Sequence, residues 1–218
     1  MVDPQLDIEP YLEAAAEKSM RITHIFETHV QADHVSGAHR LARATGAPVF
    51  LHESAEARFP HCDLADGDEH SMGNVWLEIL HTPGHTRDGI SILVTDRSRT
   101  REPWFVLTGD TLFSGGVGRP DLLGDAAEGP LAEQLYESLH GRLMTLPDHI
   151  EVYPAHFGGA ACGKGLSGKA GSTIGFERRF NPALQRASRS EFVSWVLADL
   201  PPQPAAFAEN RLRNLAGE

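Results

Sequence analysis

The stretch His29-Val30-Gln31-Ala32-Asp33-His34 begins three residues after the apolar run 22–26. A second stretch, His81-Thr82-Pro83-Gly84-His85-Thr86, directly follows the apolar run 75–80. Each pattern is typical of a short β-strand that ends in a loop carrying imidazole or carboxylate side chains. Imidazole and carboxylate together suit zinc, iron or manganese. The two stretches therefore predict a metal site at the edge of a sheet.

The same arrangement occurs twice more along the chain. Asp110 follows the apolar run 104–107, and His156 follows the run 150–153. A lone histidine is most often a hydrogen-bonded surface or capping residue. Five candidate ligands that each follow a predicted strand are better explained by a shared metal site. His29 and Gln31 alternate along an extended segment, which permits two adjacent metal pockets, with Asp110 as a carboxylate between them. His85 would complete the first pocket and His156 the second, with Asp33 and His34 turned back towards the same edge.

Composition limits the kind of protein. The 218 residues, 41% of them hydrophobic, are expected to form one globular domain over residues 1–218. The net charge of −11 argues against nucleic-acid binding, which usually needs a basic face. No apolar run reaches the roughly 18 residues of a membrane span, and the N-terminus lacks the features of a secretion signal. Cys62 and Cys162 lack CxxC spacing, which is typical of free thiols in a reducing cytoplasm.

The pattern of apolar residues predicts alternating helices and strands. We expect helices over residues 8–18, 36–44, 131–143, 173–180 and 189–200, and strands over 22–26, 48–51, 75–80, 90–94, 104–107 and 150–153. The glycine-bearing stretches 110–129 and 157–171 are expected to be loops. This order of elements around two groups of strands predicts an α/β sandwich.

Taken together, the His-x-x-x-Asp-His run, Pro83-Gly84-His85-Thr86, Thr108-Gly109-Asp110 and Pro154-Ala155-His156 resemble the metallo-β-lactamase-fold superfamily. The resemblance covers nearly the whole chain and implies an αββα sandwich with the metal at the sheet edges. Within the superfamily, Thr28-His29 and Gly118-Arg119-Pro120-Asp121 are most similar to the persulfide dioxygenases. Those enzymes oxidise a low-molecular-weight thiol persulfide, such as glutathione persulfide, with O2 to sulfite and thiol.

The residue at position 31 distinguishes classes of enzyme within the superfamily. Most of its zinc hydrolases have a histidine there, whereas this chain has Gln31. A neutral amide is a weak ligand, so the three-histidine pocket of a binuclear zinc site is lost. The resemblance to persulfide dioxygenases implies a single Fe(II) held by His29, His85 and Asp110. Two histidines and one carboxylate on one face leave coordination positions open. Asp33, His34 and His156 would then orient ligands or water.

Four residues near these motifs are candidates for substrate binding. Arg119 could hold a substrate carboxylate or pair with Asp121, and Arg178 could contact the peptide part of the substrate or solvate a helix end. Cys162, beside Lys164, could carry sulfur or gate the substrate, or be an ordinary exposed thiol. Glutathione-using members commonly have Asp-Tyr where this chain has Phe157-Gly158. The parent thiol therefore stays open among glutathione, coenzyme A, cysteine and other bacterial thiols.

The N-terminus differs from the family pattern. Val2-Asp3-Pro4 corresponds to the end of an early strand, so the first strands of the fold are expected to be missing. An exposed sheet edge invites pairing with another chain, so a homodimer is expected.

Two other functions remain open at this point. One is a zinc-dependent thioester hydrolase resembling glyoxalase II (hydroxyacylglutathione hydrolase), in which Asp33, His34, Asp110 and His156 hold a single Zn2+ that generates hydroxide. The other is a catalytically impaired sulfur-binding domain that uses Cys162. Lactamase activity is disfavoured, since the loops resemble those of the thiol-processing branch.

Overall fold

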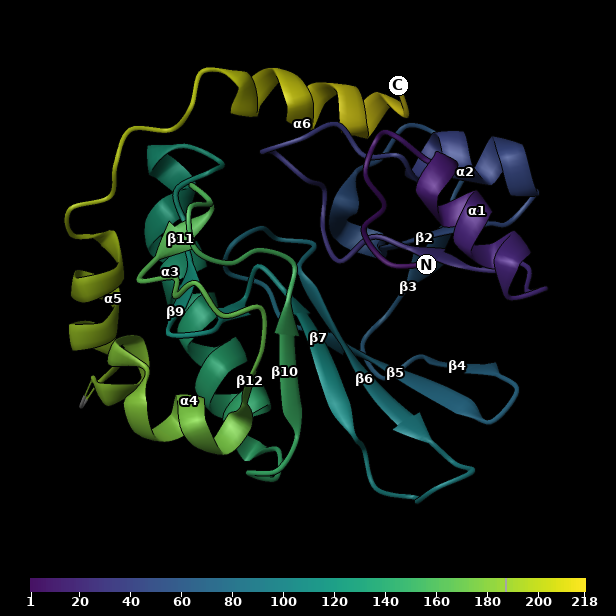
Figure 1. The fold of residues 1–218 in the computed structure, drawn as a ribbon. Coiled ribbons are helices and arrows are strands. Elements are labelled where there is room, and N and C mark those ends of the chain that lie inside the picture. The colour runs from purple at the N-terminus through teal and green to yellow at the C-terminus, as the bar shows by residue number, and fades with distance from the viewer. Residues whose placement is uncertain (187) are drawn as a thin grey trace. The chain divides into compact units, whose positions relative to one another are not determined.

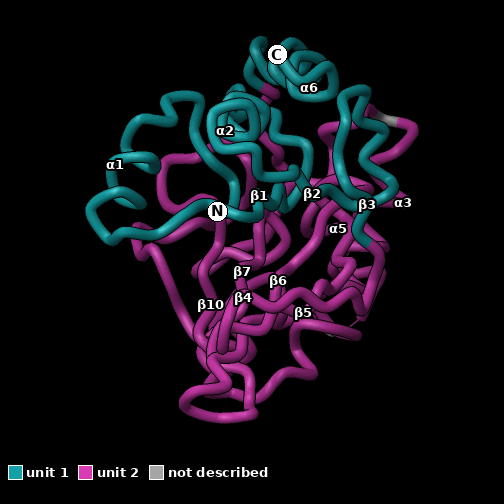
Figure 2. The backbone as a smooth tube through the Cα atoms, turned by 90° about the vertical axis from the view of Figure 1, so that its right-hand side faces the viewer, with its two compact units in different colours: residues 1–64, 204–218 teal, residues 65–203 magenta. Residues whose placement is uncertain are grey.

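The structure is a computed structural model that describes residues 1–186 and 188–218. It divides into two compact units, shown in different colours in Figure 2. Unit 1 comprises residues 1–64 and 204–218, and unit 2 comprises residues 65–203. Each unit has its own sheet and its own apolar core. Among the described residues, no helix combines the length and the apolar character that crossing a bilayer requires.

Unit 1 is built on a parallel three-stranded sheet in the order β1 (Ile25–Phe26), β2 (Val49–His52), β3 (Cys62–Leu64). Helices α1 (Glu9–Glu17) and α2 (Ala38–Thr45) contribute Leu12 and Leu41 to a core shared with Ile25 and Val49. Gly46 ends α2 in the left-handed conformation, which glycine adopts without steric cost. A short 3-10 turn, η1 (Glu53–Ala55), follows β2.

The last helix, α6 (Ala206–Ala216), also belongs to unit 1 and was not among the predicted elements. Only Phe207 and Leu215 of this helix are buried, while Leu212 is 60% exposed. Leu215 packs with Val30 and Leu51. Two buried positions eight residues apart leave no apolar stripe of the kind that identifies a helix from sequence.

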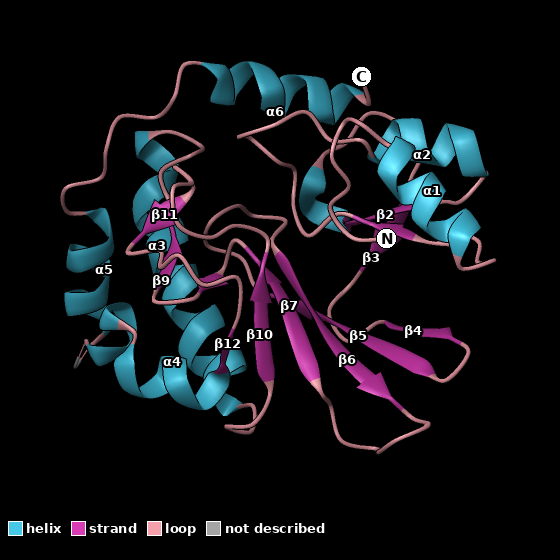
Figure 3. Ribbon diagram, viewed as in Figure 1, coloured by secondary structure: helices cyan, strands magenta, loops and turns pink. Residues whose placement is uncertain are grey.

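Unit 2 is built on a six-stranded sheet in the order β12-β10-β7-β6-β5-β4 (Figure 3). Its strands are β4 (Glu69–Met72), β5 (Val75–His81), β6 (Ile90–Asp96), β7 (Phe105–Gly109), β10 (Glu151–Pro154) and β12 (Ser172–Thr173). The strands β4 to β7 pair antiparallel, and β10 pairs parallel with β7 and antiparallel with β12. Consequently β5, β7 and β10 run in the same direction and end at the same edge.

Three helices of unit 2 lie against one face of this sheet (Figure 1). They are α3 (Asp125–Glu137), α4 (Ile174–Phe180) and α5 (Arg189–Leu197). Leu135 and Phe192 from these helices share a core with Val106 and Val152 from the strands. Short turns connect the elements: η2 (Ser138–Arg142), which is π-helical, and the 3-10 turns η3 (Leu143–Thr145) and η4 (Pro182–Gln185).

The prediction that 110–129 and 157–171 are loops was wrong in part. Short strands β8 (Leu112–Phe113), β9 (Gly116–Gly118) and β11 (Gly163–Lys164) form a small sheet in the order β11-β9-β8. Strands of two or three residues depend on their partners, so they carry no local signal. Helix α3 also begins earlier than predicted, with Pro130 inside it. Proline lacks the N–H of a helix interior, so the sequence suggested a start after it.

Gly84, in the loop after β5, lies against α3 so closely that a larger residue should destabilise the fold. Its φ is +144°, and an added Cβ would lie 2.4 Å from the Cα of Leu135. We expect Gly84→Ala to lower the free energy of unfolding by roughly 1–3 kcal/mol, because the loop must move off the helix. Urea unfolding followed by circular dichroism measures this change. Gly129→Ala is the matched control, since nothing lies within 4 Å of an added Cβ there. Equal stability of the two variants would contradict the packing argument.

Candidate metal centre

Three of the predicted site residues come together in unit 2. His85 lies in the loop after β5, Asp110 directly follows β7, and His156 follows β10. The Nε2 atom of His85 lies 3.4 Å from Oδ2 of Asp110. The Nδ1 atom of His156 lies 2.7 Å from Oδ1 of the same carboxylate. Each oxygen of Asp110, which is 2% exposed, therefore faces an imidazole.

The protonation of His85 follows from its other ring nitrogen. Its Nδ1 lies 2.8 Å from the main-chain carbonyl of Arg119, and a carbonyl can only accept a hydrogen bond. Nδ1 therefore carries a proton, and Nε2 is the atom that faces Asp110. Burial lowers the pKa of His85, and the opposing effect of the Asp110 charge is smaller. A neutral imidazole and a carboxylate turn two lone pairs towards each other, an arrangement that a cation between them would stabilise.

The donor set of unit 2 thus fits a metal ion of the kind the sequence predicted. Imidazole nitrogen and carboxylate oxygen are ligands that both iron and zinc accept. Gly118, which had no predicted role of its own, allows the chain of β9 to lie close to Asp110 and His85. A Cβ at Gly118 would lie 2.0 Å from the main-chain oxygen of Asp110 and 2.9 Å from Cβ of His85. The position of this glycine directly before Arg119, within a family motif, was the feature of the sequence that could have indicated its role.

Arg119 holds several segments of unit 2 together. Its Nε and Nη2 atoms each donate to one oxygen of Asp121 at 2.7 Å, and Nη2 also donates to the Pro201 carbonyl at 2.7 Å. Nη1 donates to the Ala161 carbonyl at 3.3 Å, and the side chain is 1% exposed. Burial alone would raise the pKa of Asp121, but the hydrogen bonds and charge of Arg119 outweigh it and lower that pKa. These contacts favour the alternative in which Arg119 pairs with Asp121 over a substrate contact.

Arg178 and Lys164, the two other basic residues predicted to bind substrate, also form hydrogen bonds within the protein. Arg178 donates to the carbonyls of Met144 and Leu146 at 2.9 and 2.7 Å and pairs with Asp148. Lys164 donates to the carbonyls of Trp195 and Ala198 at 2.9 and 2.7 Å, at the C-terminal end of α5. Their roles in substrate binding stay predictions, and these contacts do not support them.

Cys162 lies near the same carboxylate. Its thiol and ligand atoms of Asp110 and His156 lie within 4.8 Å of one another. Cys162 is 2% exposed, which contradicts the alternative of an ordinary exposed thiol. The main-chain carbonyl of Cys162 accepts a hydrogen bond from the Arg119 N–H at 3.0 Å, which fixes this loop beside β9.

His29, Asp33 and His34 belong to unit 1, in the loop after β1. His29 is 2% exposed, and its Nδ1 lies 3.0 Å from the Thr28 hydroxyl. His34 Nδ1 lies 3.0 Å from Oδ1 of Asp33. Asn214 of α6 donates from Nδ2 to the carbonyls of Gln31 and His34, both at 2.9 Å. No local pattern points to Asn214, because 180 residues separate it from His34.

Gln31 has an unusual environment. Its side chain is 0% exposed, and neither amide atom has a hydrogen-bond partner among the described residues. A buried polar group without a partner costs about 1–3 kcal/mol. An ordered water or a bound molecule would each satisfy such an amide, which lies in the middle of the predicted ligand loop.

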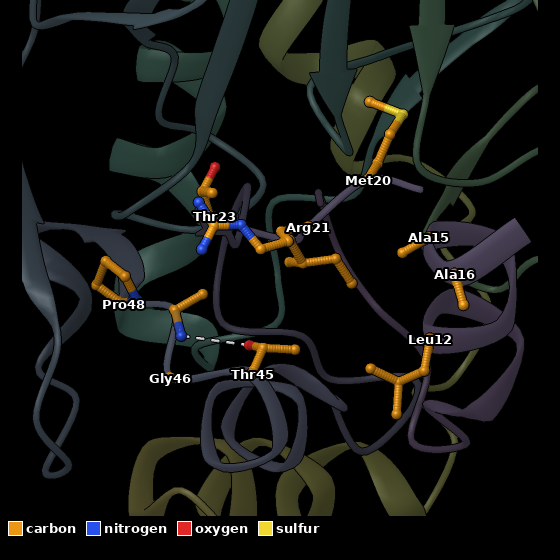
Figure 4. A pocket seen from close by; sticks show the side chains of 11 residues that line it. Leu12, Ala15, Ala16, Met20, Arg21, Thr23, Thr45, Gly46 and Pro48 are labelled. Atoms are coloured by element: carbon orange, nitrogen blue, oxygen red, sulfur yellow. Dashed lines mark hydrogen bonds between the residues drawn. The ribbon is translucent and has the colours of Figure 1, made fainter. Parts of the chain in front are cut away.

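A separate hollow in unit 1, of about 460 Å³, contains none of the predicted site residues (Figure 4). Leu12, Ala15 and Ala16 of α1 line it, together with Thr45 at the end of α2. Among the described residues that line it, Arg21 alone is charged. The described part of its lining therefore contains no imidazole, thiol or carboxylate for metal chemistry.

Comparison with known proteins agrees with this geometry. Residues 1–156 match the family model described as the metallo-beta-lactamase superfamily. The chain is similar to a hydroxyacylglutathione hydrolase of Polaromonas sp., at 37% identity over 71% of this chain and 56% of that protein. It is also similar to the human mitochondrial persulfide dioxygenase ETHE1, at 30% identity over 95% of this chain and 75% of that protein.

Solved structures give the same result. A metallo-beta-lactamase from Staphylococcus aureus superposes with a TM-score of 0.92 at 32% identity, covering 100% of this chain and 65% of that one. ETHE1 from Myxococcus xanthus superposes with a TM-score of 0.84 at 34% identity, covering 100% and 88%. This chain thus spans only about two thirds of the first structure and about half of the first relative. The predicted α/β fold of metallo-β-lactamase type is confirmed, and the chain belongs to the metallo-β-lactamase superfamily.

Proposed function

We propose that this chain is a non-haem iron persulfide dioxygenase. The observation that carries the proposal is Gln31, which stands where the family resemblance implies a ligating histidine in most zinc hydrolases of this fold. Its buried amide has no partner among the described residues. Similarity to two proteins named ETHE1, over 95% and 100% of the chain, supports the same branch. In the proposed reaction, one thiol persulfide, one O2 and one water give one thiol, one sulfite and two protons.

The proposed ligands of Fe(II) are His29, His85 and Asp110. The geometry of unit 2 supports the last two, and the family resemblance supplies His29. Bound Fe(II) would provide open coordination positions for the persulfide and O2, together with the electrons that O2 activation needs. The carbonyl of Arg119 keeps Nε2 of His85 turned towards the metal position.

His156 is the proposed acid–base group of the site. Asp110 accepts a hydrogen bond from its Nδ1, which orients the ring and leaves Nε2 to take or deliver a proton. Water that attacks the oxidised sulfur must lose protons as sulfite leaves, so a group of this kind is needed. Asp33 and His34 remain proposed as groups that orient ligands or water, and the amide of Gln31 is proposed to bond to the bound persulfide.

Two alternative functions each have an observation in their favour. The Polaromonas relative supports a zinc-dependent thioester hydrolase, in which Asp33, His34, Asp110 and His156 would hold the metal. The position of Cys162 beside Asp110 and His156 supports a sulfur-binding domain with impaired catalysis. The parent thiol, the homodimer and the cytoplasmic location stay predictions.

Metal content and oxygen uptake test the proposal together. We expect protein loaded anaerobically with Fe(II) to retain one iron per chain and to consume O2 with glutathione persulfide. His85→Ala and Asp110→Ala should lose both the iron and the activity, because each removes a ligand. His149→Ala is the control, since that histidine is exposed. Stoichiometric zinc without iron, together with thioester hydrolysis, would refute the dioxygenase and favour the hydrolase.

The identity of residue 31 gives a second prediction. Gln31→His restores an imidazole at the position that zinc hydrolases use. We expect the ratio of bound zinc to bound iron, measured by elemental analysis after loading with both metals, to rise by an order of magnitude or more. Persulfide-dependent O2 uptake should fall. Gln5→His makes the same chemical change at an exposed position and should leave both quantities unchanged. An unchanged metal ratio in Gln31→His would show that this residue does not select the metal.

A further inference from the structure

Three residues of unit 1 form a continuous chain of hydrogen bonds that ends at His29. The main-chain N–H of Thr28 donates to Oδ1 of Asp3 at 2.7 Å, and the Thr28 hydroxyl donates to Oδ2 of Asp3 at 2.9 Å. The same hydroxyl oxygen lies 3.0 Å from Nδ1 of His29. A carboxylate only accepts, so the hydroxyl proton points to Asp3 and its oxygen must accept from Nδ1–H of His29. The lone pair of His29 is therefore on Nε2.

The main chain fixes Asp3 at this place. Its N–H donates to the carbonyl of Phe26 at 2.9 Å, and the N–H of Phe26 donates to the carbonyl of Met1 at 2.9 Å. Val2 forms a parallel bridge with Phe26, so the segment lies beside β1. Asp3 has a φ of +44°, in the left-handed region that aspartate adopts more readily than most residues. This backbone turns the carboxylate towards Thr28.

We propose that Asp3 is a positioning residue that acts through Thr28 to fix the tautomer of His29 and to make its Nε2 a stronger metal ligand. The inference rests on the proposed function only in taking His29 as a ligand. A negative charge at the end of the chain increases the electron density that the imidazole offers to a cation. His85 is oriented by the same principle, but its Nδ1 bonds to a neutral carbonyl.

Replacement of Asp3 by asparagine should reverse this chain of hydrogen bonds while it keeps the shape of the side chain. The amide oxygen would accept from the Thr28 N–H, which places the amide NH2 at the Thr28 hydroxyl. The hydroxyl oxygen must then accept from that NH2, so its own proton no longer points to residue 3 and is free to donate to Nδ1 of His29. Nδ1 becomes the acceptor and Nε2 carries the proton, in the position that the metal requires. Asp3→Ala removes both bonds but leaves the hydroxyl able to accept from Nδ1–H.

The two variants therefore separate tautomer from stability. Nitrogen-15 chemical shifts of the His29 ring, measured in metal-free protein and assigned with His29→Ala, report the tautomer directly. We expect the Nδ1–H form in the wild-type protein and in Asp3→Ala, and the Nε2–H form in Asp3→Asn. Titration with Co(II), followed by its visible absorption, should show about tenfold weaker binding for Asp3→Asn. Asp3→Ala should bind more tightly than Asp3→Asn, although its melting temperature should be the lower of the two.

Control variants keep the test specific. Asp7→Asn changes the same charge in the same N-terminal segment, where Asp7 accepts a hydrogen bond from the N–H of Glu9 at 3.3 Å. This variant should match the wild-type protein in every measurement. Thr28→Ser retains the hydroxyl and should preserve the tautomer and the Co(II) affinity, whereas Thr28→Val should weaken Co(II) binding.

The His29 tautomer and the Co(II) affinity can each contradict the inference. An unchanged His29 tautomer in Asp3→Asn, with Co(II) affinity within about twofold of wild type, contradicts it. Affinity losses that follow the melting temperatures, with Asp3→Ala the weaker binder, would assign Asp3 a purely structural role. If His29→Ala binds Co(II) as tightly as wild type, the proposed metal centre fails as well. The tautomer result in metal-free protein distinguishes that failure from failure of the hydrogen-bond chain.

Discussion

The buried carboxylate of Asp110 is the group on which the candidate centre depends. It directly follows β7, with each oxygen facing an imidazole, one 2.7 Å and the other 3.4 Å away. A buried carboxylate is costly unless protons or a cation neutralise it. His156 donates a hydrogen bond to one oxygen of Asp110, and the carbonyl of Arg119 orients His85 at the other. The common direction of β5, β7 and β10 places all three loops at one edge.

Each histidine predicted to bind the metal presents its Nε2 because its Nδ1 already has an oxygen partner. For His85 the partner is the main-chain carbonyl of Arg119, and for His29 it is the hydroxyl of Thr28. Arg119 can hold its carbonyl in place because its own guanidinium is buried against Asp121 and two carbonyls. The guanidinium of Arg119 therefore supports the candidate site, and the orientation of His85 depends on this support.

Much of the candidate site could be predicted because its members are local in sequence. His85, Asp110 and His156 each follow an apolar run, and the structure brings them together as that pattern indicated. The supporting residues could not be found in this way. Asn214 bonds to the loop of His34 across 180 residues, and Asp3 bonds to Thr28 across 25. Hydrogen bonds over such separations leave no periodic pattern in the chain, so only the folded structure shows them.

The sequence by itself determined the family, the α/β fold, the strand exits that carry candidate ligands and the substitution of glutamine at position 31. These features follow from local patterning, since a strand and the loop after it are adjacent in the chain. Tertiary structure decided which ring nitrogen of His29 and of His85 carries the proton, the ion pair of the buried Arg119 with Asp121, and the approach that only a glycine at position 118 permits. Those properties depend on distances between segments that are remote in sequence, and the folding of the whole chain sets such distances.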